Sequence, residues 1–116
     1  MTCSQFDVVD VPFPFSDLPR SKRRKALVLS DRTFNRKNAS TLLTMITSAS
    51  RSAWHLDVSL EQWSEAGLRK PCIARMKMFT LDNGLILGAV GRLEKNDQRR
   101  VIGALRAALP LRLPTK

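Results

Sequence analysis

The sequence has 116 residues, which is the size of a single domain (residues 1–116) with a real hydrophobic core. Its 20 Lys and Arg residues against 10 Asp and Glu residues give a net charge of +10, which favours a polyanionic partner: nucleic acid, an anionic membrane surface or an acidic protein segment. Two cysteines with one histidine cannot form a structural zinc site, and no apolar run approaches the roughly 20 residues that span a bilayer, so we expect a soluble cytoplasmic protein.

The N-terminal segment predicts a strand followed by a loop. In residues 7–15, DVVDVPFPF, apolar residues recur at every second position, which is typical of a strand with one apolar face. Pro12 and Pro14 cannot donate to a strand ladder, so they indicate a sheet edge or a bulge. Residues 16–24 are polar and carry turn-forming residues, which predicts a loop.

Two further strands are predicted before the middle of the chain. Residues 25–30, KALVLS, are apolar on both faces, which predicts a central strand. Residues 40–50 are β-branched and apolar, which predicts the third strand. The segment between them, residues 31–38, is basic, and we expect it to be a connecting loop.

The second half predicts three more strands. Residues 55–60 alternate and indicate a half-exposed strand, and the segment after them predicts one helical turn that ends at Gly67. Residues 72–82, CIARMKMFTLD, alternate again. The sequence DNG at 82–84 is a strong hairpin signal, so we expect residues 85–90 to pair back onto that strand.

The C-terminal segment predicts a helix. Asn96 or Asp97 would cap it, apolar residues follow at helical spacing, and Pro110 prevents its continuation. The whole pattern predicts a mainly β fold with five or six strands, mostly antiparallel, in a small, strongly curved sheet or barrel with one C-terminal helix.

The first candidate for chemistry is Arg24, with Arg23 and Lys22 beside it. Arg24 stands where a loop becomes a strand, so its guanidinium would be held in place to bind a phosphate through two hydrogen bonds. The simpler alternative is a solvated basic loop that only contributes affinity.

The second candidate is the pair Thr47 and Ser48, at the end of the third strand. Hydroxyl groups at strand ends often only satisfy backbone groups in a turn. However, if the second and third strands are antiparallel neighbours, Arg24 begins one and Thr47 ends the other. A phosphate between them would meet a cation and a hydroxyl donor.

Other residues allow less specific conclusions. His55 is the only histidine, which excludes a two-histidine nuclease within one chain and favours a surface role. Arg75 and Lys77, on the outward face of their strand, could follow a sugar-phosphate backbone or simply be solvated. Trp54 and Trp63 could stack on bases or be buried.

The scattered Asp and Glu residues suggest no two-metal site, and we expect no metal or other cofactor.

Taken in order, the motifs DVVDVPFPFSD, SKRRKALVLS, TMITS, AGLRKPCIARMKMFTLD and VGRLEKND resemble the MazF/PemK family of toxins from bacterial toxin-antitoxin systems over nearly the whole chain. The resemblance implies an SH3-like curved barrel of the MazF/PemK/CcdB type, a homodimer, an acidic antitoxin partner and metal-independent cleavage of single-stranded RNA. Arg24 and Thr47 match the family's catalytic residues. The residues implied or proposed to contact RNA are Ser16, Asp17, Ser21, Lys22, Arg23, Ser48, Arg75 and Lys77.

Three positions depart from the family pattern. Phe6 stands where the family usually has Gly, Lys25 replaces a usual Pro after the arginine, and Cys72 stands where Ser is common. Because Pro would fix φ at the start of the strand, Lys25 is expected to leave Arg24 less well ordered.

The resemblance implies a specific chemistry. The RNA 2′-hydroxyl would attack the adjacent phosphorus, which gives a 2′,3′-cyclic phosphate and a 5′-hydroxyl, while Arg24 and Thr47 stabilise the charge on the phosphoryl oxygens. Two alternatives stay open: a non-enzymatic toxin of the same fold that binds DNA gyrase, and a basic nucleic-acid-binding module that never cuts.

Overall fold

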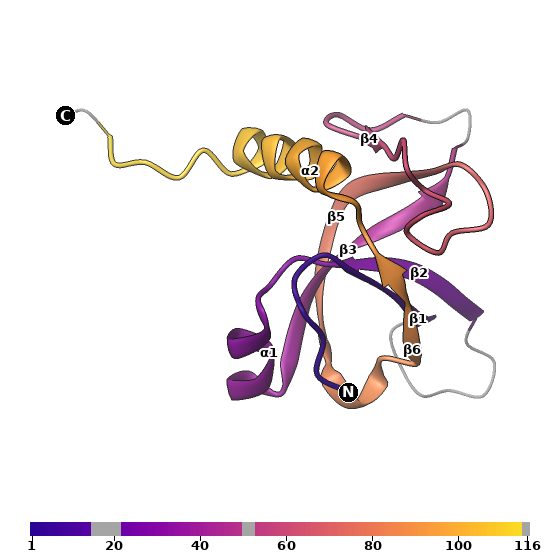
Figure 1. Cartoon of the computed structure of the whole chain (residues 1–116). Helices are drawn as coiled ribbons and strands as arrows, with labels where there is room; N and C mark the ends of the chain where they lie inside the picture. Colours follow the sequence, from indigo (N-terminus) through magenta and orange to yellow (C-terminus); the bar gives the residue numbers. More distant parts are fainter. Residues whose placement is uncertain (15–21, 50–52, 115–116) are drawn as a thin grey trace.

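The fold is a strongly curved, six-stranded antiparallel sheet with a long helix across one end (Figure 1). The computed structural model describes residues 1–14, 22–49 and 53–114. The strand order is β4-β5-β3-β2-β1-β6, which confirms the predicted mainly β fold. The elements are β1 (Asp7–Phe13), β2 (Lys22–Val28), α1 (Arg32–Asn38), β3 (Ser40–Ser48), β4 (Val58–Ser59), β5 (Cys72–Asp82), the 3₁₀ helix η1 (Asn83–Leu85), β6 (Gly88–Arg92) and α2 (Lys95–Ala108).

Apolar residues cover both faces of the central strands. On β1, Val8 belongs to the core that includes residues of α2, whereas Val9 and Val11 belong to a second core on the other face. All three are fully buried, so the prediction of a single apolar face for this strand is incomplete. The central position of β2 is confirmed, because β2 lies between β1 and β3.

The proline-containing end of β1 is a local edge, as predicted. The pairing of β1 with β6 stops at Asp10, while its pairing with β2 continues to Phe13. Pro12 therefore has no strand neighbour on the β6 side. On that side its missing N–H costs no ladder bond. The predicted loop is shorter than expected, because Lys22–Arg24 already belong to β2. Residues 15–21 lie outside the described residues.

The predicted hairpin after β5 is wrong. β6 pairs with β1 rather than with β5, at the opposite edge of the sheet. The side chain of Asn83 is drawn inward, where it accepts a hydrogen bond from Thr41 Oγ1 at 2.7 Å and donates one to Asn35 O at 2.8 Å. The backbone forms η1 here in place of a two-residue turn, with Ile86 N donating to Asn83 O, and the chain continues past β5 to β1.

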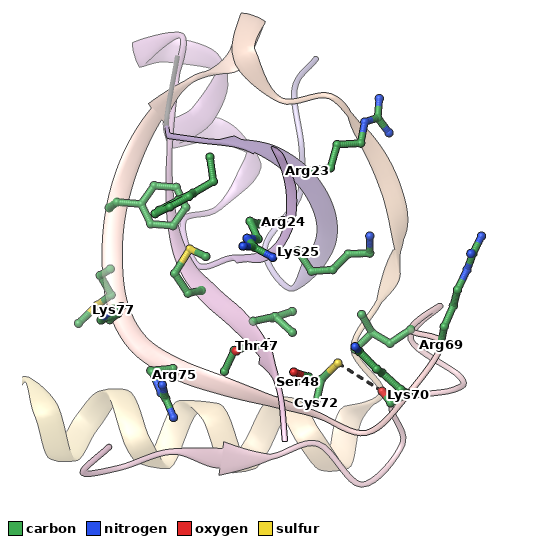
Figure 2. A pocket seen from close by; sticks show the side chains of 16 residues that line it. Arg23, Arg24, Lys25, Thr47, Ser48, Arg69, Lys70, Cys72, Arg75 and Lys77 are labelled. Atoms are coloured by element: carbon green, nitrogen blue, oxygen red, sulfur yellow. Dashed lines mark hydrogen bonds between the residues drawn. The ribbon is translucent and has the colours of Figure 1, made fainter. Parts of the chain in front are cut away.

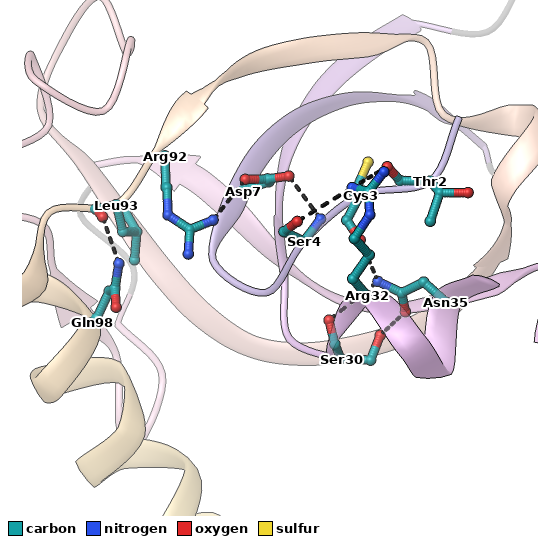
Figure 3. Close-up of polar contacts among 10 residues, drawn as sticks. All are labelled: Thr2, Cys3, Ser4, Asp7, Ser30, Arg32, Asn35, Arg92, Leu93 and Gln98. Carbon is teal, nitrogen blue, oxygen red and sulfur yellow. Dashed lines mark hydrogen bonds and ion pairs between the residues drawn. The ribbon is translucent and has the colours of Figure 1, made fainter. Parts of the chain in front are cut away.

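The basic segment after β2 is the helix α1, not the predicted loop. Asp31 caps it by accepting a hydrogen bond from Phe34 N at 2.8 Å. Asn35 is fully buried and donates to Cys3 O and Ser30 O, which ties the helix to the N-terminal segment (Figure 3). Apolar periodicity missed this helix because its buried anchor is an amide rather than a hydrocarbon.

Two boundaries in the second half also differ from the prediction. Of residues 55–60, only Val58–Ser59 form a strand, because Leu56 has a φ of 71° that interrupts an extended chain. The cap of α2 is Glu94 rather than Asn96 or Asp97. Asp97 is fully buried and accepts hydrogen bonds from Glu61 N and Gln62 N, so it supports the neighbouring turn instead.

The predicted turn before β5 does end at Gly67. Gly67 has a φ of 89°, and a side-chain carbon there would lie 2.5 Å from Val90 O, so only glycine fits. Among the described residues, no helix is both long and apolar enough to cross a membrane.

Candidate active site

β2 and β3 separate at one end of the sheet, and a cavity opens there. Their pairing ends at Ala26 with Met45. Beyond that point β2 stays paired with β1 as far as Lys22, whereas β3 stays paired with β5 as far as Ser48. Because the two strands follow different neighbours, a cavity of about 770 Å³ lies at the split.

The cavity is lined by cations. Figure 2 shows Arg24 near the centre of the view, with Thr47 and Ser48 below it. Among the described residues that line it, none is Asp or Glu, so its potential favours an anion. We call it the cationic cavity; its seven Lys and Arg residues are Arg23, Arg24, Lys25, Arg69, Lys70, Arg75 and Lys77.

Arg24 is distinguished from its neighbours by the alternation of β2. Lys25 and Arg23 both reach Asp10 on β1, at 2.6 and 3.5 Å. Arg24 takes the other face, where its guanidinium carbon lies 6.0 Å from the centre of the Phe13 ring. No carboxylate among the described residues pairs with Arg24. Its charge is therefore available to a bound anion.

Thr47 and Ser48 provide hydroxyl groups on the opposite wall. Both are half-buried at the end of β3, where they pair with Ile73 and Cys72 of β5. The predicted antiparallel pairing of the two strands is confirmed, but β2 begins at Lys22 and β3 ends at Ser48, so Arg24 and Thr47 lie near the strand ends rather than at them. The two residues face the cavity across the split rather than adjoining in a continuous ladder.

Arg75 lines the cavity but is already bound. Its Nε and Nη2 donate to the two carboxylate oxygens of Asp57 at 3.1 and 3.0 Å. These hydrogen bonds lower the pKa of Asp57 and raise the pKa of Arg75. Because only 11 % of the Arg75 side chain is exposed, this residue supports the wall more than it extends an open cationic track.

Lys77 occupies an irregularity of β5 at the cavity. Thr44 and Met45 are consecutive on β3, but their partners on β5 are Met78 and Arg75. Two residues, Met76 and Lys77, therefore bulge from the ladder. Bulges redirect side chains near functional sites, and Lys77 is exposed and lines the cavity.

The remaining predicted residues fall into three groups. Arg23 and Ser48 line the cavity, whereas Lys22 does not; Ser16, Asp17 and Ser21 lie outside the described residues.

Sequence reasoning missed two cations of the cavity, Arg69 and Lys70. Their signal was the basic pair in GLRKP, immediately before β5. This basic pair alone does not indicate the cavity, because its place there depends on the pairing of the start of β5 with the end of β3.

The lone histidine lies outside the cavity, and of the two cysteines only Cys72 lines it. His55 is exposed and does not line the cavity. Burial raises the pKa of the Cys72 thiol, so this thiol stays protonated at neutral pH and is a poor nucleophile. In the described ranges, no three His, Cys, Asp or Glu residues gather in a way that could hold a metal ion.

Lys25, which replaces the usual proline, is held in the strand, and its effect on the order of Arg24 stays a prediction. Lys25 pairs in register with Asp10, and its ammonium binds the Asp10 carboxylate at 2.6 Å. The ladder with β1 fixes the backbone of Arg24 from both sides, since Arg23 and Lys25 also have strand partners.

The chain matches known proteins in family and in fold. A sequence model of the PemK-like, MazF-like toxin of type II toxin-antitoxin systems matches residues 4–109. No curated protein matches the sequence.

Solved structures share the fold at low identity. A MazE-MazF complex (Form-III) from Deinococcus radiodurans has a TM-score of 0.76 at 18% identity, covering 97% of this chain and 100% of that one. An endoribonuclease from a mycobacterial species has a TM-score of 0.74 at 16% identity, covering 98% and 97%. An endoribonuclease in complex with its cognate antitoxin, also mycobacterial, has a TM-score of 0.72 at 17% identity, covering 97% and 98%.

Proposed function

Because the chain belongs to the PemK-like, MazF-like toxins of type II toxin-antitoxin systems, we propose that it is a metal-independent endoribonuclease that cuts single-stranded RNA. The observation that carries this proposal is the cationic cavity at the split between β2 and β3. One wall presents Arg24, which has no carboxylate partner among the described residues, and the other presents the hydroxyl of Thr47.

A phosphodiester suits this cavity better than a neutral or cationic ligand. Seven cations and no carboxylate line it within the described residues. Asp10 and Asp57 pair with three of these cations, and the excess that is left attracts a polyanion and its successive phosphates. A single strand would enter more easily than a duplex, because in-line attack requires a backbone whose bases can be unstacked.

In the proposed reaction the RNA supplies its own nucleophile. The 2′-oxygen forms a bond to the adjacent phosphorus and loses its proton, while the bond from phosphorus to the 5′-oxygen breaks and that oxygen gains a proton. Negative charge builds on the phosphoryl oxygens in the transition state. The guanidinium of Arg24 would donate hydrogen bonds to those oxygens, and Thr47 would donate a further one.

We also propose that the active form is a homodimer controlled by an acidic antitoxin. Two of the similar structures are complexes with an antitoxin. A net charge of +10 would draw an acidic segment onto the cationic cavity, where it would compete with RNA.

The test is an RNA cleavage assay with three proteins: the wild type, Arg24→Ala and Arg106→Ala. Arg106 is an exposed residue on α2, so its replacement removes the same charge away from the cavity. The wild type and Arg106→Ala should cut single-stranded RNA, while Arg24→Ala should be about 10²- to 10³-fold slower.

The same three proteins, assayed for RNA cleavage, RNA binding and DNA gyrase inhibition, separate the alternatives. A wild type that binds RNA but never cuts it would support a binding module and contradict the proposal. A protein that inhibits DNA gyrase and is unaffected by Arg24→Ala would support the gyrase-binding alternative. Cleavage by Arg24→Ala at the wild-type rate would show that the site is wrongly assigned.

A further inference from the structure

Trp54 is a large aromatic residue placed at the surface beside the cationic cavity. It is 45% exposed, whereas Trp63 packs against the core. The Nζ of Lys77 lies 4.9 Å from the centre of its ring and the guanidinium carbon of Arg75 lies 5.9 Å away. Both of these cations line the cavity, so Trp54 adjoins it at the β5 wall.

The backbone of Trp54 is held by hydrogen bonds. Its backbone N–H donates to Asp57 Oδ2 at 2.9 Å, and the backbone N–H of Asp57 donates back to Trp54 O at 3.1 Å. The same carboxylate binds Arg75 on β5. One aspartate thus ties the Trp54 turn to the cavity wall, which reduces the conformational entropy that a ligand would have to remove on binding.

This arrangement combines the two features that bind a single-stranded nucleotide. An exposed indole on a hydrogen-bonded turn offers a surface on which any base can stack, and a nearby ammonium can bind the phosphate that follows it. The β5 bulge brings Lys77 to this point, between the Trp54 ring and the cavity that holds Arg24 and Thr47.

We propose that Trp54 and Lys77 form a nucleotide subsite, in which a base of the bound RNA stacks on the indole of Trp54 and Lys77 binds the adjoining phosphate. The inference rests on the proposed function in that the ligand is the same single-stranded RNA whose phosphate enters the cationic cavity. The subsite holds a nucleotide beside the scissile one and contributes affinity and register, not chemistry.

The test measures binding without cleavage. Wild type, Trp54→Ala, Trp54→Phe and the control Phe34→Ala are titrated with a fluorescent single-stranded RNA that is 2′-O-methylated throughout and so has no 2′-hydroxyl nucleophile. Phe34 is 48% exposed on α1 and does not line the cavity. We expect Trp54→Ala to raise Kd about 5- to 150-fold, Trp54→Phe to raise it less, and Phe34→Ala to leave it unchanged.

An abasic scan locates the stacked base. One nucleotide at a time is replaced by an abasic unit. At one position, the abasic replacement should raise the Kd of the wild type by about the same factor as Trp54→Ala does. The same replacement should raise the Kd of the Trp54→Ala variant little further. Lys77→Ala should reduce the slope of log Kd against log salt by about 0.7.

The result that overturns the subsite is an unchanged Kd for Trp54→Ala, or equal losses for Trp54→Ala and Phe34→Ala. A change in oligomeric state with unchanged RNA affinity would assign Trp54 to a protein interface and also overturn it. Binding and cutting are measured separately, so a wild type that binds this RNA through Trp54 but cuts no unmodified RNA would contradict only the proposed nuclease function.

Discussion

Asp57 and Arg75 are joined by two parallel hydrogen bonds, of 3.1 and 3.0 Å, at the wall of the cationic cavity. Both side chains are nearly buried, with 13 % and 11 % exposed. The bonds from Arg75 are the main reason that the pKa of Asp57 is lowered, and burial opposes them. The pair fixes Arg75 in β5, and through the Asp57 hydrogen bonds it also fixes Trp54.

The Asp57–Arg75 pair should make the free energy of unfolding fall as the pH becomes acidic. A carboxyl group whose pKa is lower in the folded protein stabilises it above the unfolded pKa, about 3.9, and this contribution is lost as the pH falls below that value. Asp57→Asn should therefore lower the urea midpoint at pH 7. As the pH falls below about 4, the midpoint of the variant should fall less than that of the wild type, because the variant has no Asp57 contribution left to lose. The measurement is urea unfolding across this pH range.

Asp82→Asn is the matched control, because Asp82 is exposed at the end of β5. It should leave the pH dependence of the wild type intact. If Asp57→Asn loses as much stability in acid as the wild type does, the pair is not what makes the protein sensitive to acid.

The hydroxyl of Thr47, rather than its shape, should matter for cleavage. Thr47→Val keeps the volume of the side chain but removes the donor, and we expect a rate loss of about 10²-fold or more. Thr47→Ser keeps the donor and should retain most of the activity. Single-turnover rates at saturating RNA make the comparison, and equal rates for the Val and Ser variants would exclude a role for the hydroxyl.

Phe6 combines backbone strain with core packing, and the packing should dominate. Its φ is 72° and only 7% of it is exposed. A non-glycine residue in this region costs about 1–2 kcal/mol, whereas loss of a buried phenyl ring costs about 3–5 kcal/mol. Phe6→Gly should therefore destabilise the protein by about 1–4 kcal/mol, even though it relieves the strain and restores the residue that the family usually has.

Phe6→Ala separates these two contributions, since it loses the ring and keeps the strain. In urea unfolding the order of stability should be wild type, then Phe6→Gly, then Phe6→Ala. A Phe6→Gly variant more stable than the wild type would show that the strain outweighs the packing.

Binding of an acidic antitoxin should compete with RNA and weaken as salt rises. Exposed charges are screened beyond about 8 Å at physiological ionic strength, so an electrostatically steered complex loses association rate first. The measurement is pull-down from the native host followed by titration at several salt concentrations. Failure to recover any small acidic protein, or an association rate independent of salt, would count against this partner.

Local patterns predicted the strands well because each strand carries its own signal. Residues 25–30 are apolar on both faces because β2 lies in the middle of the sheet with a core on either side. The Arg24 and Thr47 hypothesis followed from one assumption about pairing, that β2 and β3 are antiparallel neighbours, and the structure confirms that assumption.

The errors arose where long-range contacts override a local signal. The DNG sequence is a strong turn signal, yet Asn83 is pulled inward by Thr41 and Asn35, which are more than 40 residues away. The bulge at Met76 and Lys77 and the turn that places Trp54 beside Lys77 likewise depend on contacts between distant segments. No pattern within a single window of sequence contains them.

The most direct test of the central claim uses one oligoribonucleotide with and without a single 2′-deoxy substitution at the cleaved position, in excess EDTA, with product ends analysed by mass. We predict that the unsubstituted RNA is cut to 2′,3′-cyclic phosphate and 5′-hydroxyl ends and that the substituted RNA is intact at that position, because the attacking group is missing. Cutting at the deoxy position, 5′-phosphate products, or loss of all cleavage in EDTA would contradict the account.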